Sequence, residues 1–426
     1  MKSKQFSKEN QRIERITQAT LVVGIDIAKE MHVAQAVTFR GITLSRQAFS
    51  FANSEGGFES LERIIRKWQQ IGRMNDVIIG MESTGHYWFN LADWLMERGI
   101  QVVIVNPATT KRNKENRDNT PSKSDAKDAL VIADVVSRGY YTPYQTQEEA
   151  FERIRTLMTN RERWVTQSTR LSNQITRWLD IRFPEMMSVF KEVGCARSLA
   201  TLHEFPAPSD LLGLTPEEVV NRWGKHMKRP GGTRGLRKAR QLLKQASLSV
   251  GKKTSLEEDK WDLACLLDEY ERVQRILEET NARIDQLLAE IPGVAQLESM
   301  GLTRIYIAAI LAGAGDLRKF EHGNQLLRKA GLNIAERSSG KYQGKVKLSK
   351  RGSSMLRKYL YLAVLHLTNV NPEFQAWRTY NLEVKRIPKK KSAIKLIGKL
   401  ARMLVAMSTT GEFYSAEKAR PHSLAV

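Results

Sequence analysis

Cysteine is scarce in this chain of 426 residues, which contains only Cys195 and Cys265. Neither cysteine has a histidine or a second cysteine nearby at the spacing of a zinc site. A disulfide framework and a structural zinc site are therefore excluded. The composition fits the reducing interior of a cell, and we expect a cytoplasmic protein.

Three further patterns are missing from the sequence. No run of about 18 apolar residues occurs, so we expect no membrane-spanning helix and no membrane partner. The first residues, Met1–Gln5, are polar or basic and lack the apolar core of a signal peptide. The phosphate-binding pattern Gly-x-x-x-x-Gly-Lys-(Ser/Thr) is absent, so we expect no nucleotide-binding loop.

Acidic residues are in deficit. The chain has 68 Lys and Arg against 46 Asp and Glu, which gives a formal net charge of +22. An excess of this size predicts a polyanionic partner, and nucleic acid fits it better than a membrane surface. The length leaves room for two or three domains.

Three stretches place carboxylates at unusual positions. The apolar run 21–28 contains Asp26, and burying an ionised Asp there costs several kcal/mol unless a cation or hydrogen bonds compensate. A second apolar run, 77–81, ends in Glu82. A third stretch opens a helix with Asp125 and Asp128, which share one face at the i,i+3 spacing.

These four acids predict a metal site if they converge at one end of a sheet. A cluster of carboxylates is repulsive without a cation, and oxygen ligands suit Mg²⁺ or Mn²⁺. Structural explanations stay open for each acid. Asp125 is favoured by the helix dipole, Glu82 can cap the end of its strand, and the three stretches can be unrelated. Asp26 is the hardest to explain structurally, because it interrupts a central strand.

The order of predicted elements indicates a fold for the first third of the chain. Strands are expected at 21–27, 32–39, 42–51, 76–82 and 101–105, with helices at about 54–68, 86–98 and 125–138. This order, βββαβαβα, is that of the ribonuclease H-like fold, an α/β fold with a mixed sheet. The acids fall on the first strand, the fourth strand and the late helix, where that fold collects acids.

The rest of the chain is expected to be mainly helical. An arginine-rich helix is predicted at 146–180, short helices at 181–253, and a basic loop at 228–235. Residues 256–291 repeat apolar side chains every seven positions, as in a coiled coil. We favour self-association through this seam, with helix 146–180 as the alternative internal partner. The predicted domains are 1–145, 146–290 and 291–426.

The last part of the chain is the most basic. Ile291-Pro292-Gly293-Val294 breaks the long helix and predicts a helix-hairpin-helix-like start, with helices expected at 353–369, 372–386 and 391–410. Residues 337–341 are predicted to form a loop that contains Ser338 and Ser339, and a serine in a loop is ordinarily a turn residue. Basic residues without an intervening acid follow it and predict nucleic-acid binding: Lys341, Lys345, Lys347, Lys350 and Arg351.

The chain contains the motifs Gly24-Ile25-Asp26, Glu82-Ser83-Thr84-Gly85, Lys123-Ser124-Asp125-Ala126-Lys127-Asp128-Ala129, Ile291-Pro292-Gly293-Val294, Phe320, Ala330-Gly331-Leu332, Leu348-Ser349-Lys350-Arg351-Gly352 and Leu356-Arg357. In these motifs it resembles a known family, the DEDD transposases of bacterial insertion sequences, whose N-terminal domain resembles the RuvC Holliday-junction nuclease. The resemblance covers about 20–140 and 288–370 and does not extend to 185–255.

The resemblance implies a transposase or recombinase that cuts and rejoins donor and target DNA. It implies that Asp26, Glu82, Asp125 and Asp128 hold Mg²⁺ or Mn²⁺, and that a serine after Ala330-Gly331-Leu332 forms a phosphoserine link to DNA. This serine matches Ser339, with Ser338 as the alternative. The resemblance further implies a noncoding bridge RNA that pairs with both DNAs, and a bacterial protein that works at the nucleoid. We expect a homo-oligomer, a dimer or a tetramer.

Two other functions stay open. A metal-dependent RuvC-like nuclease or Holliday-junction resolvase would use water as nucleophile, and Ser339 would then be a turn residue. A non-catalytic nucleic-acid-binding protein would keep the acids without metal. The acid cluster argues against the second of these, and the matching C-terminal motifs argue against the first.

Overall fold

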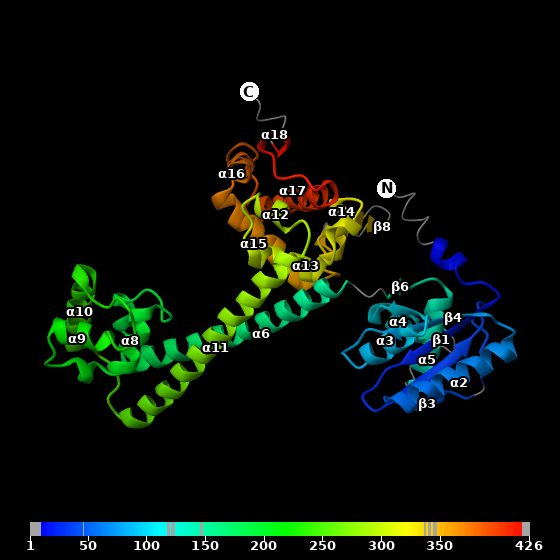
Figure 1. The fold of residues 1–426 in the computed structure, drawn as a ribbon, viewed down its shortest axis with the longest axis horizontal. Helices are drawn as coiled ribbons and strands as arrows, with labels where there is room; N and C mark the ends of the chain where they lie inside the picture. Colours follow the sequence, from blue (N-terminus) through cyan, green and yellow to red (C-terminus); the bar gives the residue numbers. More distant parts are fainter. Residues whose placement is uncertain are drawn as a thin grey trace. The chain divides into compact units, whose positions relative to one another are not determined.

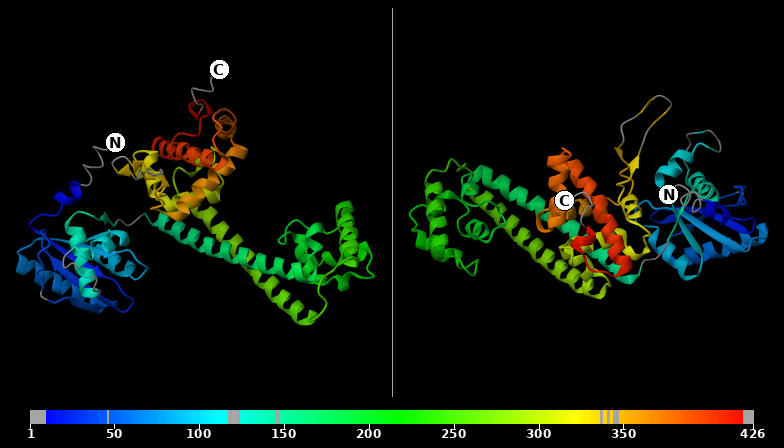
Figure 2. Two further views of the ribbon diagram at one scale, coloured as in Figure 1. Left: turned by 180° about the vertical axis from the view of Figure 1, so that it is seen from behind. Right: turned by 90° about the horizontal axis from the view of Figure 1, so that it is seen from above.

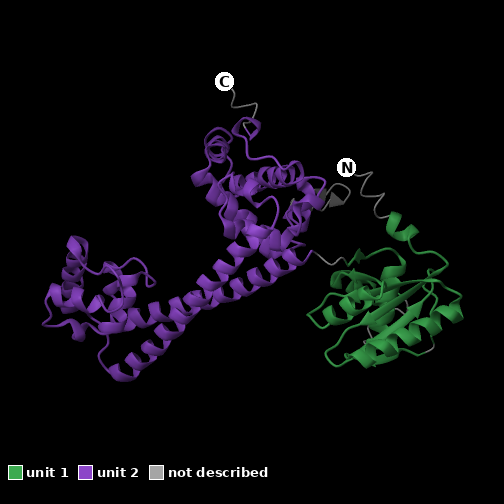
Figure 3. Cartoon of the chain, in the orientation of Figure 1, with its two compact units in different colours: residues 1–146 green, residues 147–426 purple. Residues whose placement is uncertain are grey.

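A computed structural model describes residues 10–45, 47–116, 120, 124–144, 148–335, 338–339, 342–343 and 347–419. The chain divides into two compact units, residues 1–146 and residues 147–426, shown in Figure 3. Each is described here by itself. No helix among the described residues is long and apolar enough to cross a membrane.

The first unit is built on a mixed sheet of six strands in the order β3-β2-β1-β4-β5-β6. β1 pairs with β4 in parallel, and Gly24 lies opposite Gly80. The strands are β1 (Thr20–Asp26), β2 (Met31–Val37), β3 (Phe49–Ala52), β4 (Asp76–Glu82), β5 (Gln101–Val105) and β6 (Thr142–Pro143). The central strands form because their residues are apolar on both faces, as is typical of strands covered on both sides.

Helices cover both faces of this sheet (Figure 1). Residues such as Val23 and Ile79 face α2 (Glu55–Gly72) and α3 (Phe89–Glu97). Their neighbours Val22 and Ile78 face the opposite way, toward α5 (Asp125–Ser137). This alternation follows from the twofold period of a strand, and it gives three layers with α5 beneath the ends of β1 and β4.

The structure differs from the sequence prediction at three elements of this unit. The predicted strand 42–51 is reduced to β3, with one isolated bridge at Thr43, because the polar side chains of Ser45 and Gln47 interrupt the apolar alternation. The short edge strand β6 is not expected from the sequence. A helix that the sequence does not predict, α4 (Pro107–Asn113), follows β5. Asn106 caps α4 by accepting a hydrogen bond from Ala108 N at 2.8 Å.

The second unit is organised around two long helices that run in opposite directions, α6 (Glu149–Arg182) and α11 (Leu256–Glu290). Arg153 near the start of α6 bonds Glu290 at the end of α11 at 3.2 Å. At the other end Trp178 Nε1 donates to the carbonyl of Asp259 at 2.8 Å. The apolar seam of α11 is thus packed on α6 of the same chain, which is the internal partner that the sequence left as the alternative.

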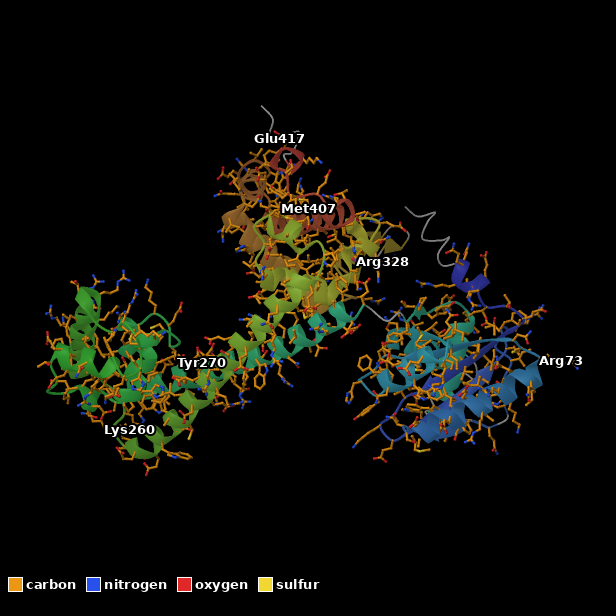
Figure 4. All side chains as sticks on the ribbon, viewed as in Figure 1. Arg73, Lys260, Tyr270, Arg328, Met407 and Glu417 are labelled. Carbon is orange, nitrogen blue, oxygen red and sulfur yellow. The ribbon has the colours of Figure 1, made fainter. Side chains whose placement is uncertain are left out.

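One end of this helix pair carries a helical module, residues 183–250 (Figure 1). It comprises α7 (Met186–Val189), α8 (Ala196–Glu204), α9 (Pro216–Trp223) and α10 (Gly232–Ser247). Its core includes the fully buried Trp223 and, from α11, Tyr270, which is labelled in Figure 4. The prediction of a basic loop at 228–235 is wrong for its last residues, because the helix α10 already begins at Gly232.

The other end of the pair carries a C-terminal cluster of helices with its own core. Its main helices are α12 (Val294–Glu298), α13 (Arg304–Ala314), α14 (Gly323–Lys329), α15 (Ser354–Val370), α16 (Pro372–Thr379) and α17 (Lys389–Thr410). Helix α13 packs on α6 and α11, α15 packs on α13, and α17 packs on α15 in the same core. The chain as a whole is therefore an α/β unit followed by a mainly helical region, as the sequence predicts.

Candidate active site

Asp26 and Glu82 are the last residues of the neighbouring parallel strands β1 and β4. Because Ile25 lies opposite Met81, the two carboxylates end their strands at the same level. Each acid comes two residues after a glycine, Gly24 or Gly80, and so points to the same face as that glycine. This is the face that α5 covers.

The two glycines explain how α5 lies so close to the sheet. A Cβ atom on Gly24 would lie 2.2 Å from the carbonyl oxygen of Ala129, and one on Gly80 would lie 2.4 Å from Cγ2 of Val136. Any larger residue would therefore push α5 away. With glycine in both strands, the first turn of α5 and its two acids reach the strand ends.

The four predicted acids line one pocket of about 570 Å³. Asp125 and Asp128 come from the first turn of α5, where Ser124 caps the helix by accepting a hydrogen bond from Lys127 N at 3.2 Å. The remaining lining is given by the ends of β1 and β4 and by α4 and α5: Ile27, Thr84, Pro107, Thr110, Lys111, Lys114, Val131 and Ile132. The structure thus brings all four acids together from three stretches of sequence.

Burial and repulsion act together on Asp26. The pKa of Asp26 is raised to about 6, first because burial disfavours the charged form, and then because Asp128, Asp125 and Glu82 lie close by. Lys114 acts in the opposite direction but is the smallest cause. A cation that enters the pocket would stabilise the charged form of this buried carboxylate, which the neighbouring acids repel.

Two of the acids have partners from α4 and the residue after it. Glu82 accepts hydrogen bonds from Thr84 Oγ1 at 2.8 Å and from Thr110 Oγ1 at 2.5 Å. Lys114 Nζ lies 2.8 Å from both oxygens of Asp128, yet only Oδ2 accepts its hydrogen bond. Asp128 Oδ1 is buried without a hydrogen bond among the described residues.

The donor set fits a hard divalent cation, because it consists of carboxylate oxygens around a repulsive centre with one buried oxygen left without a hydrogen bond. In the arrangement seen, however, no group of three or more acids, histidines or cysteines within the described ranges is close enough to share one ion. In this arrangement Glu82 is bonded to Thr110 and Asp128 to Lys114.

Sequence reasoning missed the contribution of α4. The dipeptide Asn106-Pro107 marks the end of β5, but it is also a helix start, with Asn at the N-cap and Pro at the first helical position. Taken as a helix start, this dipeptide would have indicated α4, the helix that brings Thr110 and Lys111 to the acids. Lys114 then follows directly.

The serines predicted for the C-terminal region lie in a strand rather than in a loop. Ser338–Ser339 form β8, which pairs with β9 (Tyr342–Gln343) so that Ser339 lies opposite Tyr342. A second ladder, β7 (Ile334–Ala335) with β10 (Lys347–Leu348), supports this hairpin. Two short antiparallel ladders thus hold Ser339 opposite Tyr342, and the described parts of this ribbon stand out beside α14 in the right-hand view of Figure 2.

The predicted nucleic-acid-binding residues divide into two groups. Lys347, Lys350 and Arg351 are exposed at the base of the ribbon. Lys341 and Lys345 lie outside the described residues. Arg357 Nη1 donates to the carbonyl of Ala330 at 2.8 Å and so ties the start of α15 to the residues before the ribbon.

Comparisons with known proteins agree with this organisation. A family model of DEDD type, described as a transposase, matches residues 23–184 and therefore contains all four acids. A second model, the transposase IS116/IS110/IS902 family, matches residues 285–378 and contains the serine ribbon. Together the two models match more than half of the chain, in the expected order.

Relatives of similar length are known in three bacteria. The chain is 28% identical to an uncharacterized 44.8 kDa protein of insertion element IS116 from Streptomyces clavuligerus, over 80% of this chain and 83% of the relative. It is 24% identical to the transposase for insertion sequence element IS1111A of Coxiella burnetii, over 88% and 90%. It is 25% identical to a probable family 20 transposase of Pseudomonas aeruginosa, over 90% and 96%. The chain therefore belongs to the IS116/IS110/IS902 family of transposases, and its enzyme class is that of a DNA transposase or recombinase.

Proposed function

We propose that this transposase cuts and rejoins donor and target DNA with the acid pocket of its first unit and a serine of its second. The observation that carries the proposal is the convergence of Asp26 and Glu82, at the ends of neighbouring parallel strands, on the first turn of α5. We also infer that the first unit is ribonuclease H-like. The central order β3-β2-β1-β4-β5 with the acids on β1, β4 and a late helix supports that inference.

The acids Asp26, Glu82, Asp125 and Asp128 would hold one or two Mg²⁺ or Mn²⁺ ions. A bound ion of this kind polarises the scissile phosphate and neutralises charge on the leaving oxygen. For the acids to bind it, Glu82 has to release Thr110 and Asp128 has to release Lys114. The freed ammonium of Lys114 and that of Lys111 then face the negative phosphate of the DNA at the same pocket.

The serine step conserves the energy of the phosphodiester bond in a serine–phosphate bond. Oγ of Ser339 attacks phosphorus, an Oγ–P bond forms and the P–O3′ bond breaks. The hydroxyl proton of the serine is lost, and the leaving 3′ oxygen takes up a proton to become a free 3′-OH. Reversal with a different 3′-OH rejoins the strands, so no nucleotide is consumed. A serine hydroxyl is a weak nucleophile alone, and an ion held by the four acids would supply its activation.

The position of Ser339 supports this role. It lies at the turn-proximal end of β8, with Lys347, Lys350 and Arg351 at the base of the same ribbon. Lysine and arginine at these places would bind the phosphates that flank the attacked one. Ser338 precedes it in the same two-residue strand, so the two serines have to be compared experimentally.

We further propose that a noncoding bridge RNA supplies sequence recognition and that the working form is a homo-oligomer, a dimer or tetramer. Both proposals rest on the family resemblance. The apolar seam of α11 is already packed on α6, so the contact between copies has to use other surfaces. Guidance by RNA leaves the protein to bind backbone and shape, which agrees with its excess of basic residues.

The experiment that tests the proposal traps the covalent intermediate. Protein is incubated with a labelled, nicked DNA substrate and Mg²⁺, then separated by denaturing electrophoresis. We expect an adduct with the parent chain and with Ser338→Ala, and none with Ser339→Ala or Asp26→Asn. An adduct that survives in Ser339→Ala and is lost in Ser338→Ala would move the nucleophile by one residue. Metal-dependent cleavage without any adduct would instead establish a water-using nuclease or resolvase.

A further inference from the structure

The module at the far end of the helix pair belongs to the part of the chain that neither family model matches, residues 185–284. Its sequence is unusual in charge. Between Glu218 and Glu257 there is no acidic residue, whereas the same stretch contains eleven Lys and Arg. The acid pocket and the serine ribbon use none of them.

Helix α10 presents much of this charge on one face. Its apolar face packs into the module through Gly235, Ala239, Leu242 and Ala246. The opposite face is basic and exposed and consists of Arg234, Arg237, Arg240 and Lys244. No hydrogen bond or ion pair of these four side chains occurs within the part of the chain that the structure describes.

This basic face lowers the stability of its own helix. Arg237 and Arg240, and Arg240 and Lys244, repel each other at the i,i+3 and i,i+4 spacings. Arg234 lies in the first turn, where the helix dipole favours acids, and that turn contains no acid. A face that costs stability and is left without partners is explained by a ligand of opposite charge.

The face is held on a packed support. Trp223 of α9 is fully buried in the core of the module and donates its indole N–H to Thr201 Oγ1 at 3.0 Å. Arg182, only 3% exposed, anchors the segment that follows α10 by donating to the carbonyls of Lys252 at 2.8 Å and Thr254 at 2.6 Å. Along α6, the buried contacts of the C-terminal cluster end at Met158 and those of the module begin at Leu171, which lies about 20 Å further along the helix.

We propose that the basic face of α10 binds the phosphate backbone of duplex DNA, away from the serine ribbon. Duplex DNA is favoured over RNA because a single exposed helix fits the wide major groove of B-form DNA, whereas the major groove of A-form RNA is too narrow for it. The proposal requires membership of the DNA transposase family but not the metal or serine chemistry.

The test compares two full-length variants that lose the same charge. One is Arg237→Gln/Lys244→Gln on α10. The control is Arg275→Gln/Arg283→Gln on α11, whose exposed arginines stand among acids. Binding to a 40-base-pair duplex is measured over a range of salt. We expect the salt slope of log affinity to fall by about 2 in the α10 variant and to stay unchanged in the control, with about tenfold weaker binding at physiological salt.

Equal salt slopes for the two variants would overturn the proposal. So would a loss that appears with an RNA duplex and not with DNA, since it would assign the face to RNA. Circular dichroism and thermal melting check that both variants fold. If the double variant does not fold, Lys244→Gln alone is measured, and a slope that fails to fall by about 1 overturns the proposal equally. DNA cleavage is not the readout, so failure here leaves the proposed strand chemistry standing.

Discussion

The acid pocket of the first unit and the basic face of α10 are opposites in construction as well as in charge. Four acids from three distant stretches line the pocket, and burial together with repulsion from the other acids raises the pKa of Asp26 to about 6. The basic face spreads four cations along one exposed helix, where solvent screens each of them. We therefore expect one substitution to abolish the function of the pocket, whereas single substitutions in a basic surface should each lower DNA affinity by a small factor.

The largest effect is expected from Asp26→Asn. The amide keeps the shape but removes a charge that a divalent ion needs, so strand transfer should fall by about a thousandfold or more. Affinity for DNA should change less than about twofold, because basic residues elsewhere supply it. Strand-transfer rates and filter-binding affinities check the two halves. Parental strand transfer in the variant would rule out a role for Asp26 at the reaction centre.

Gly24→Ala should come next, although it touches no acid. Its Cβ would meet the backbone of α5 at Ala129, which forces the first turn of the helix away from the strand ends. We expect about 1–3 kcal/mol of lost stability and about a hundredfold lower strand transfer. Gly56→Ala is the matched control, because a Cβ there meets nothing within 4 Å. If the two variants melt and react alike, close packing of α5 does not place the acids.

Lys114→Met should have an intermediate effect, and it should strengthen metal binding rather than weaken it. The ammonium of Lys114 competes with a metal for the oxygens of Asp128, and removing it should tighten Mn²⁺ binding about fivefold to tenfold. Lys111→Met is the control, since Lys111 lines the same pocket but makes no ion pair with an acid among the described residues. Strand transfer should fall in both, because the phosphate loses a cation. Unchanged Mn²⁺ affinity in Lys114→Met would mean that the ion pair does not obstruct the site.

The smallest effects belong to single basic residues. Lys350→Gln or Arg351→Gln should weaken binding to a DNA duplex by about twofold to fivefold and lower the salt slope by about 1. Lys67→Gln on the exposed surface of α2 is the control and should leave both quantities unchanged. A hundredfold loss from a single basic residue would contradict the stepwise behaviour expected of a dispersed surface.

The sequence predicts the acid pocket well for a physical reason. An ionised side chain inside an apolar strand is costly, so Asp26 and Glu82 stand out without any structural information. The pattern glycine-x-acid occurs in both strands and marks where a helix crosses closely. Helix α4 was less visible, because Asn106-Pro107 serves both as a strand stop and as a helix start.

Other features could not be predicted from local sequence patterns. The heptad repeat of α11 predicts an apolar seam but does not say what covers it, and the partner turned out to be α6 of the same chain. The hairpin around Ser339 consists of strands two residues long, which are too short to show alternation. The basic face of α10 is visible as an acid-free stretch, but its sidedness depends on the packing of Gly235 and Ala239.

The most direct test of the account is calorimetric titration of Mn²⁺ into the DNA-free protein. We expect saturable binding to the parent chain, at least tenfold weaker binding in Asp26→Asn, and parental binding in Ser339→Ala and in the α10 variant. Circular dichroism confirms that all four proteins are folded. Equal Mn²⁺ affinity in the parent chain and Asp26→Asn would contradict the claim that these acids form a metal site.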